Sequence, residues 1–376
     1  MRARQLIVAA LALATLLPVA ARAEPYLTVR AGAKCSDCHT NLTGGGKRSA
    51  FPKIHAHDIL HDLEILPIPA RAKAFDGQIV SQLSIGSDFR LRNTTTFSDD
   101  PNSRGNVPEN RAFRTGNTVN DTEVQEFLLY LEIDLLPEVL KLYVDEDFSG
   151  GATNREVFGL LRSVLPWDGY VKAGRFFPAF GLRVYDDEAY IRSRSGFTFQ
   201  NSDEGVEFGI APGPFFFATS ITDGEEGDTD VQATFNGYAV LDDLPVVRSA
   251  LVGASFARQS DERWTAGWYA GANLWRFTGL AEFDLIDDTT DTVASRDEYA
   301  SYFELNFLAF TWLNFRGTFE FLRVKGDGNQ TRYTIGAEPF IDKVIQPRIQ
   351  YRINNGPGNR PELNTAQLVL EMHLFF

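Results

Sequence analysis

Hydrophobic and polar residues alternate along the chain from about residue 77 to its end. In the last such stretch, one side is apolar and comprises Ala366, Leu368, Leu370, Met372, Leu374 and Phe376. The other side carries Gln367, Glu371 and His373. Successive side chains of a β-strand point to opposite faces, so this period of two predicts strands with one apolar face. The same alternation recurs in residues 83–92, 313–321 and 345–353.

The connections between these stretches predict the number of strands. Short turns are expected at 136–137, 166–168, 212–214, 242–245, 275–276, 308–311 and 342–343. Longer polar connections are expected at 95–121, 150–154, 178–200, 223–229, 259–263, 286–297, 325–330 and 354–362. Short and long connections that alternate in this way predict an all-β fold, an antiparallel transmembrane β-barrel of about 16 strands.

The predicted barrel suggests an outer-membrane protein. An even number of strands brings both termini to the side of the short turns, which in such barrels faces the periplasm. The terminal Phe376 on an alternating last strand resembles the signal that outer-membrane barrels present to their assembly machinery. We therefore expect outer-membrane lipid and lipopolysaccharide as surroundings of the barrel.

The N-terminal residues have the features of an export signal. Two arginines precede an apolar stretch, and Ala21-Arg22-Ala23 matches a signal-peptidase site, so residues 1–23 are expected to be cleaved and the mature chain to begin at Glu24. Residues 24–76 contain both cysteines and end in a stiff linker at 67–69, since two prolines restrict the backbone. Residues 77–376 form the barrel.

Composition excludes several classes of protein. The formal net charge is −14 and no Lys/Arg run occurs, which argues against nucleic acid as a partner. Aromatic residues make up 12% of the chain, too many for a disordered protein. Two cysteines are too few for a disulfide-rich secreted scaffold. No stretch after the signal is apolar enough for a transmembrane helix.

The candidate chemistry lies in residues 35–39, which read Cys-Ser-Asp-Cys-His. This is the attachment pattern of haem c, in which Cys35 and Cys38 bind the haem covalently and His39 is the proximal ligand of the iron. A zinc site would need further ligands and no other cysteine exists. A redox-active dithiol would need a βαβ context, and a simple disulfide is the remaining alternative. Export to the periplasm favours one covalent haem c.

The distal iron ligand has several candidates. Met1 is expected to be removed and Met372 faces lipid, so a His/Met pair is disfavoured. His57 is the preferred distal ligand, with His55 next and His61 third. A pair of histidines would lower the reduction potential relative to His/Met. The alternative is that these histidines are surface residues and the iron has five ligands.

The residues after the motif could also serve the haem. Gly44, Gly45 and Gly46 would allow the backbone to approach the macrocycle closely, or they form a flexible turn. Lys47 and Arg48 could pair with the haem propionates through charge-assisted hydrogen bonds.

Taken together, Pro25-Tyr26, Arg30, the haem motif and a C-terminal barrel resemble the fused monohaem cytochrome c–porin proteins of the bacterial outer membrane. The best-known members are the outer-membrane iron-oxidising cytochromes. The stretch 173–181 is similar to a strand-to-loop motif of phosphate-selective-type porins. The resemblance implies a haem within or at the mouth of the barrel. It also implies electron flow between an extracellular donor or acceptor and periplasmic electron carriers.

A barrel of this size has a lumen too wide for its own side chains, and residues 24–76 are too few for a large core. We therefore expect the haem segment to plug the lumen. The charges expected to line or bind it are Asp88, Arg90, Glu126, Glu132, Asp134, Arg316, Glu320, Arg348 and Arg352. Acidic clusters at 223–230 and 284–291 could attract Fe(II) or bridging divalent ions, or they are solvated loop charge.

Three functions remain open at this stage. The first is a haem electron conduit or oxidoreductase across the outer membrane, with an extracellular metal as a candidate substrate. The second is a porin whose haem segment regulates or plugs solute flow. The third is a scaffold barrel that recruits separate cytochromes.

Overall fold

The computed structural model describes nine stretches of the chain, namely residues 24–48, 77–98, 113–115, 118–224, 231–259, 263–288, 296–341, 345–358 and 360–375. The expected signal sequence, the linker at 67–69 and the candidate ligands His55, His57 and His61 lie outside the described residues.

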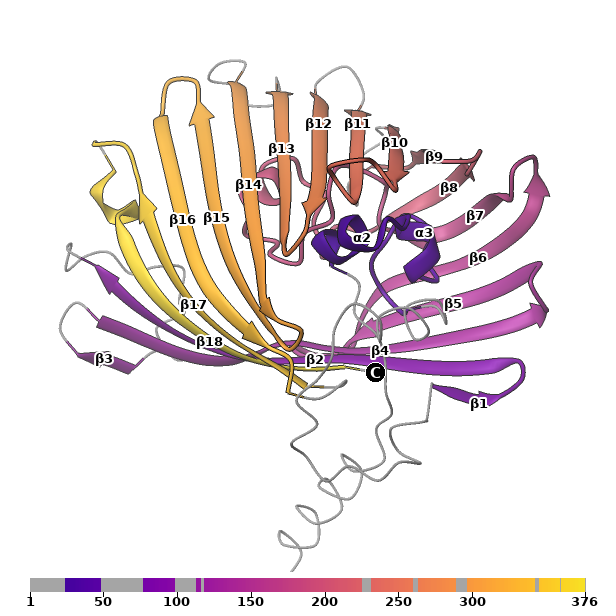
Figure 1. Cartoon of the computed structure of the whole chain (residues 1–376), viewed down its shortest axis with the longest axis horizontal. Helices are drawn as coiled ribbons and strands as arrows, with labels where there is room; N and C mark the ends of the chain where they lie inside the picture. Colours follow the sequence, from indigo (N-terminus) through magenta and orange to yellow (C-terminus); the bar gives the residue numbers. More distant parts are fainter. Residues whose placement is uncertain are drawn as a thin grey trace, which may run out of the picture.

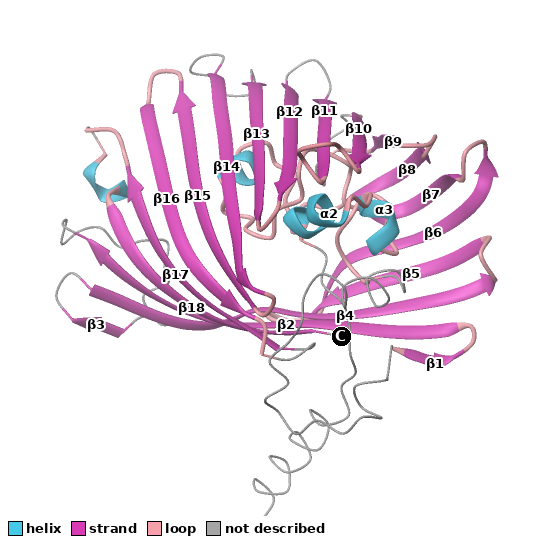
Figure 2. Ribbon diagram, viewed as in Figure 1, coloured by secondary structure: helices cyan, strands magenta, loops and turns pink. Residues whose placement is uncertain are grey.

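The described chain is mostly β-strand (Figure 2). The strands before the middle of the barrel are β1 Gln78–Val80, β2 Leu83–Ser98, β3 Phe113–Thr115, β4 Thr118–Leu136, β5 Leu140–Asp147, β6 Thr153–Leu165, β7 Gly169–Phe176, β8 Asp203–Ile210 and β9 Phe215–Thr222. The later strands are β10 Gln232–Asp242, β11 Ser249–Gln259, β12 Arg263–Leu274, β13 Phe277–Asp288, β14 Arg296–Phe310, β15 Leu313–Val324, β16 Gly328–Pro339, β17 Ile345–Asn355 and β18 Thr365–Phe375. The helices are α2 Pro25–Ala31, α3 Cys35–Cys38 and α6 Tyr190–Ser193, with a 3₁₀ turn at Pro361–Leu363.

The strands close into a barrel. Each strand from β4 to β18 pairs antiparallel with the next, and β18 returns to pair with β2, which in turn pairs with β4. Sixteen of the strands in the described chain form this ring, while the short β1 and β3 only extend its edges beside β2 and β4. The expected architecture is confirmed, and each expected connection overlaps a break between two successive strands of the ring, although several strands extend a few residues into it.

The two faces of the wall differ as the alternation predicts. On β18, Leu370 and Met372 are exposed on the outside while Glu371 and His373 are buried inside. The same holds for Ile349 and Tyr351 against their neighbours on β17. Aromatic side chains gather outside near the short turns, namely Trp167, Phe215, Trp275 and Phe310. An apolar outer band edged with aromatic residues is typical of barrels that sit in lipid. No helix among the described residues has the length and hydropathy that a membrane-spanning helix needs.

Two separate parts of the chain fill the lumen (Figure 1). Residues 24–48, here called the N-terminal segment, carry α2 and α3, and α2 packs against β11, β12 and β13. Residues 177–202, here called the inward loop, follow β7 and contain α6, which packs against β13, β14 and β15. The N-terminal segment lies near the short turns, because Lys34 Nζ binds Gly213 O at 2.5 Å and Arg30 Nη1 reaches Arg276 O at 3.5 Å.

Candidate functional site

The haem motif begins on a single short helix inside the barrel. α3 starts after Lys34, whose backbone N–H donates to Asp37 Oδ2 at 2.8 Å and so closes its first turn. The backbone N–H of Cys35 donates to the Tyr238 hydroxyl on β10 at 3.1 Å. Cys38 is buried, and both cysteines carry free thiols. His39 leaves the helix in extended conformation.

A tight turn follows the motif and brings the chain back beside it. His39 faces Arg48 in an antiparallel bridge, and Thr40 N–H donates to Lys47 O at 2.9 Å. Gly44, Gly45 and Gly46 all have positive φ, which only glycine adopts at little cost. A Cβ on Gly46 would overlap the Tyr143 hydroxyl, and one on Gly45 would lie 2.9 Å from the Phe199 ring. The three glycines therefore bring the backbone close to the barrel wall and the inward loop.

The turn is docked on the wall by polar side chains. Thr40 Oγ1 donates to Glu132 at 2.5 Å, and Lys47 Nζ is 3.4 Å from the same carboxylate. Asn41 is fully buried between Glu156, to which it donates at 2.7 Å, and Lys172, from which it accepts at 3.0 Å. Lys47 was expected beside a haem propionate, but its side chain is bound to the wall instead. Of these two cations, only Arg48 lines the cavity described next.

A cavity lies between the N-terminal segment, the wall and the inward loop. Its walls enclose about 1090 Å³ of space not occupied by atoms, part of it open to solvent. Cys35, His39, Gly44, Gly45, Gly46 and Arg48 line it from the motif side. The motif thus borders a partly open space inside the lumen.

The remaining lining combines apolar residues with charged ones. The apolar residues are Leu128, Tyr130, Phe216, Tyr238, Leu251 and Tyr269 from the wall and Leu182 and Phe199 from the inward loop. The arginines are Arg90, Arg155 and Arg183, beside Asp88, Glu126 and His373. A porphyrin has large apolar faces and two anionic carboxylates, so a lining with both aromatic residues and arginines suits it.

The inward loop contributes site residues that the sequence reasoning missed. Residues 178–200 were expected to be one of the long outer connections, yet they fold into the lumen. Arg183 Nη1 donates to Gly44 O at 3.0 Å, and its Nη2 donates to Phe177 O at 2.6 Å. Burial and the neighbouring Arg192 lower the pKa of Arg183 to about 10, which leaves it a cation at neutral pH. The inward loop contains four phenylalanines that pack in pairs, Phe177 with Phe199 and Phe180 with Phe197. These apolar residues are the feature of the sequence from which the burial of the loop could have been expected.

Burial sets the protonation of the motif. It lowers the pKa of His39 to about 3, with Arg48 adding to the effect, so the imidazole is neutral at physiological pH. The Nδ1 atom of His39 is buried and has no hydrogen-bond partner among the described residues. Burial raises the pKa of Cys38 to about 12, and it raises that of Cys35 as well. Redox-active dithiols have lowered thiol pKa values, so this environment disfavours that alternative.

The donor set therefore fits a covalently bound haem. Neutral imidazole is the form that binds iron, and Cys35 and His39 both reach the cavity. Of the candidate distal ligands, His55, His57 and His61 lie outside the described residues. The other described histidine, His373, lines the same cavity, with Nε2 at 2.9 Å from Asp88 and Nδ1 at 3.4 Å from Gln346.

The nine predicted inward charges do face the lumen, and five of them bind one of its two occupants. Glu132 and Arg348 bind the N-terminal segment, while Asp88, Arg90 and Glu126 line the cavity. The inward loop is bound by three others, since Glu320 accepts from Tyr190 N–H at 2.9 Å, Arg352 pairs with Asp186, and Arg316 stacks on Tyr185. Asp134 pairs with Lys141 of the wall at 2.7 Å.

The predicted acidic cluster at 284–291 is corrected by the structure. Asp284, Asp287 and Asp288 belong to β13 rather than to a loop, and Asp284 is fully buried toward the lumen. Asp287 accepts from Trp264 Nε1 at 2.9 Å and Asp288 lies 3.7 Å from Arg263. Nowhere in the described chain do three or more His, Cys, Asp or Glu residues gather in a way that could hold a metal ion.

Comparisons with known proteins identify the fold but no family. No family model and no curated protein matches the chain. Among solved structures, an anion-selective porin from Comamonas acidovorans has 10% identity and a TM-score of 0.54, covering 78% of this chain and 99% of that one. OprB of Pseudomonas putida has 11% identity and a TM-score of 0.55, with coverage of 78% and 94%. OmpT of Vibrio cholerae has 9% identity and a TM-score of 0.51, with coverage of 80% and 100%. The chain thus has the barrel fold of outer-membrane porins.

Proposed function

We propose that the protein is an outer-membrane barrel that carries electrons across that membrane through one covalently bound haem c. The apolar, aromatic-edged outer face and the porin fold support a place in the bacterial outer membrane, with both termini on the periplasmic side. Periplasmic carriers would be one electron partner, and an extracellular donor or acceptor such as Fe(II) would be the other.

The observation that carries this proposal is the position of the motif. C-x-x-C-H lies inside the lumen and borders a cavity whose lining includes aromatic residues and arginines. Cys35 and Cys38 would each add their S–H across one vinyl group, which forms a thioether and needs no oxidant. His39 would hold the iron, and Arg48 and Arg183 would meet the propionates. The bound haem would supply a one-electron iron couple.

The protein's own residues would then set the reduction potential of that iron couple. The N-terminal segment and the inward loop cover the cavity from two sides and limit the access of water. Burial and limited solvent exposure are two of the means by which a protein sets a haem potential. The arginines would stabilise the anionic carboxylates of the haem in this low-dielectric setting.

The direct test is a haem stain and a redox titration of the protein purified from outer membranes. A second test uses liposomes loaded with a redox dye and carrying the protein. An electron conduit should change the colour of the dye when reductant is added outside, with no release of a trapped neutral sugar. Absence of covalent haem from the purified protein would refute the proposal.

The second candidate is a porin or scaffold barrel in which the segment only plugs, regulates or recruits other cytochromes. The polar docking of Thr40, Asn41 and Lys47 on the wall favours it, since these contacts seat the segment without any cofactor. In the liposome experiment, such a barrel would release sugar or remain closed, and the dye would not change.

The distal ligand has its own test. We keep His57 as the expected ligand, so His57→Ala should convert a low-spin haem spectrum to high-spin, while His55→Ala and His61→Ala should not. His373→Ala belongs in the same series because His373 lines the cavity. A change in that variant alone would assign the ligand to the barrel, and no change in any of the four would exclude a pair of histidines.

A further inference from the structure

A second pocket, here called the outer pocket, lies at the end of the lumen where the long connections are. It encloses about 540 Å³ of space not occupied by atoms, part of it open to solvent. Phe197 of the inward loop lines it, together with Asp203, Gln232, Gln259 and Arg263 at the ends of β8, β10, β11 and β12. In the proposed orientation this end faces the outside of the cell, so an extracellular partner reaches the outer pocket directly.

The inward loop connects the outer pocket with the cavity beside the haem motif. Gly181 and Leu182 line that cavity, and Phe180 directly precedes them in the chain. The ring of Phe180 stacks on the ring of Phe197, with 4.5 Å between the centroids and 7° between the planes. Because Phe197 lines the outer pocket, one stacked contact and a short covalent stretch join the two spaces.

The stacked rings are packed without room for water. Phe180 and Phe197 form a buried cluster with Ala257 of β11, in which Phe180 is only 2% exposed. On the neighbouring β12, a Cβ added to Gly267 would lie 3.2 Å from the Phe180 ring, so the wall approaches this ring closely. Close packing of this kind holds the two rings at a constant distance.

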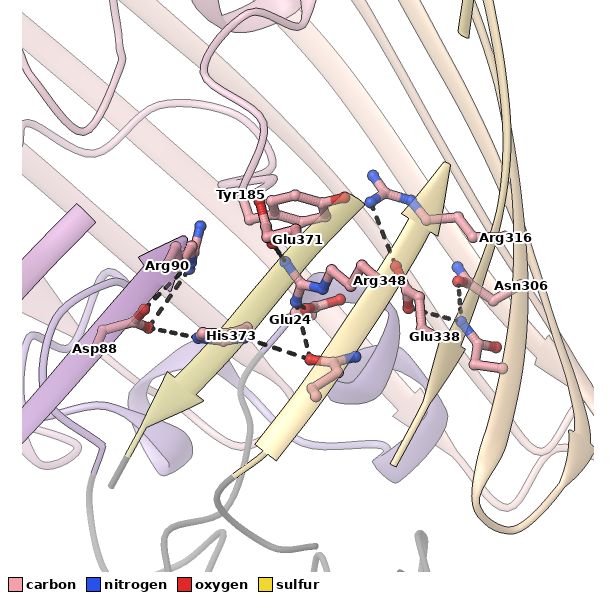
Figure 3. Close-up of polar contacts among 12 residues, drawn as sticks. Glu24, Asp88, Arg90, Tyr185, Asn306, Arg316, Glu338, Arg348, Glu371 and His373 are labelled. Carbon is pink, nitrogen blue, oxygen red and sulfur yellow. Dashed lines mark hydrogen bonds and ion pairs between the residues drawn. The ribbon is translucent and has the colours of Figure 1, made fainter. Parts of the chain in front are cut away.

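The inward loop is also anchored on both sides of the rings. Arg263 of β12 donates from Nη2 to Arg194 O at 2.7 Å, which fixes the part of the loop before Phe197. Tyr185 fixes the part after Phe180, because the Arg348 guanidinium of the wall lies 4.2 Å from the centroid of its ring (Figure 3). The contact between the rings is therefore a permanent feature of the folded barrel.

We propose that the inward loop carries electrons between the outer pocket and the haem cavity, through the stacked rings of Phe180 and Phe197. An electron crosses a protein by tunnelling, which is faster through covalent bonds and packed atoms than across a gap. A donor in the outer pocket loses one electron and the haem iron gains it, with no bond made or broken and no proton moved. This inference rests on the proposed function and adds to it an entry site and a path.

The charges of the outer pocket indicate a small cation as the donor. The carboxylate of Asp203 accepts from the backbone N–H of Glu204 at 2.8 Å, and it pairs with no cation in the part of the chain that the structure describes. Asp223 accepts from the same N–H at 3.3 Å, so a second carboxylate lies beside the first. Arg263 lies 3.7 Å from Asp288, which offsets its charge. A cleft of net negative charge raises the local concentration of cations, so the donor is a small hydrated cation such as a divalent metal ion.

Binding is measured without electron transfer, by isothermal titration calorimetry of the full protein isolated from outer membranes. The probe is hexaamminecobalt(III), a substitution-inert cation that stands in for a hydrated metal ion. We expect saturable binding that Asp203→Asn weakens severalfold. Asp297→Asn should leave it unchanged, since Asp297 is an exposed carboxylate at the same end of the barrel that pairs with Lys325.

The path is measured by stopped-flow absorbance, as the rate at which hexaammineruthenium(II) reduces the ferric haem of the same protein. Phe180→Leu and Phe197→Leu should each lower this rate severalfold without a change in midpoint potential, because the stacked contact is lost. Phe197→Tyr keeps the ring and should retain the rate. Phe303→Leu is the control, since it removes an exposed ring from the outer face of β14.

The outcomes separate this inference from the proposed function. A protein without covalent haem would refute the proposed function and the electron path together. If the haem is present and dithionite reduces it fully, unchanged rates in both leucine variants, or an equal loss in Phe303→Leu, would overturn the path alone. Binding of the cobalt complex that does not depend on Asp203 would overturn the assignment of the outer pocket to a cationic donor.

Discussion

The N-terminal segment and the inward loop both fill the lumen, but they are held there in different ways. The segment is bound through uncharged donors, such as Thr40 Oγ1, Asn41 Nδ2 and the backbone N–H of Lys47, which donates to the Tyr143 hydroxyl at 2.8 Å, and through the ion pairs Lys47–Glu132 and Glu24–Arg348. The loop is bound through several ion pairs with the wall, of which the pair Arg352–Asp186 is buried. Arg352 holds Asp186 and Glu188 from β17, and Glu298 of β14 accepts from Arg194 Nε at 2.7 Å.

This difference suggests that the two occupants serve different purposes. A hydrogen bond from a neutral donor to a carboxylate contributes about 1.5–3 kcal/mol, whereas removal of one partner of a buried ion pair costs about 3–5 kcal/mol. The loop is also continuous with the wall at both ends, through β7 and β8. The inward loop is therefore a fixed part of the barrel, and the N-terminal segment is a separate part seated against it.

The largest expected effect is the loss of the segment's proposed cofactor without loss of the barrel. In Cys35→Ala combined with Cys38→Ala, covalent haem should be absent, because no other cysteine exists. The barrel should still assemble, since every strand that the structure describes begins after residue 77. A haem stain after denaturing electrophoresis measures covalent haem, and the heat-dependent mobility of the protein in the gel measures assembly of the barrel.

The control for this variant is Ser36→Ala, which changes the same helix but neither thiol. It should keep both haem and barrel. A haem-stained band in the double cysteine variant would contradict the assignment of the motif.

The next effect concerns the ion pairs of the inward loop. Arg352→Met leaves Asp186 and Glu188 without their cation, and we expect a loss of about 3–5 kcal/mol in the free energy of unfolding. Burial alone would raise the pKa of Asp186, but Arg352 and Arg332 hold it below its usual range. The pair should thus stabilise the protein above the usual Asp pKa of about 3.9 and lose its effect as the pH falls further.

Arg360→Met is the matched control for that measurement. Arg360 also binds two carboxylates, Asp327 at 2.7 Å and Glu362 at 3.2 Å, but its side chain is 40% exposed. Exposed pairs contribute only about 0–1 kcal/mol. Equal losses in urea unfolding of the two variants would show that the inward loop is not held by its buried charges.

The seating of the segment is tested by Gly46→Ala. The new Cβ would overlap the Tyr143 hydroxyl in a backbone conformation that already disfavours alanine, so the turn should move away from the wall. We expect a destabilisation of about 1–3 kcal/mol and a higher single-channel conductance. Gly326→Ala has a similar positive φ and no atoms within 4 Å of its Cβ, so it measures the backbone strain alone. Equal effects of the two changes would mean that the turn does not depend on contact with Tyr143.

Much of the wall could be predicted from the sequence, because the period of two in a barrel strand directly reports its two faces. The inward position of Arg348 and the outward position of Met372 follow from their places in alternating runs. The haem motif was equally accessible, since its spacing is a local property. Both kinds of feature depend on neighbours in the sequence rather than on distant contacts.

The direction of the inward loop could not be predicted in the same way. Residues 178–200 carry glycine and charged residues like the other long connections. Their position in the lumen depends on partners such as Glu282, Glu320 and Arg352, which are more than 80 residues distant in the chain. The partners of Lys47 escaped prediction for the same reason, since Glu132 reaches it only after the barrel has closed.

The smallest predicted effect distinguishes the contribution of the Tyr185 ring to stability from that of its hydroxyl. The ring lies on the inward loop, and three arginines of the wall stack on it, with Arg348 at 4.2 Å and Arg316 at 4.5 Å from its centroid and Arg90 at 5.7 Å. Its hydroxyl only accepts a hydrogen bond from Gln350. Tyr185→Phe keeps the stacking and should cost about 0.5–1.5 kcal/mol in unfolding, without a change in conductance. Tyr185→Ala removes the ring and should cost more and open the lumen. If both variants behaved like the wild type, the loop would be held by its ion pairs alone, and the charge on Arg352 rather than the aromatic contact would fix it to the wall.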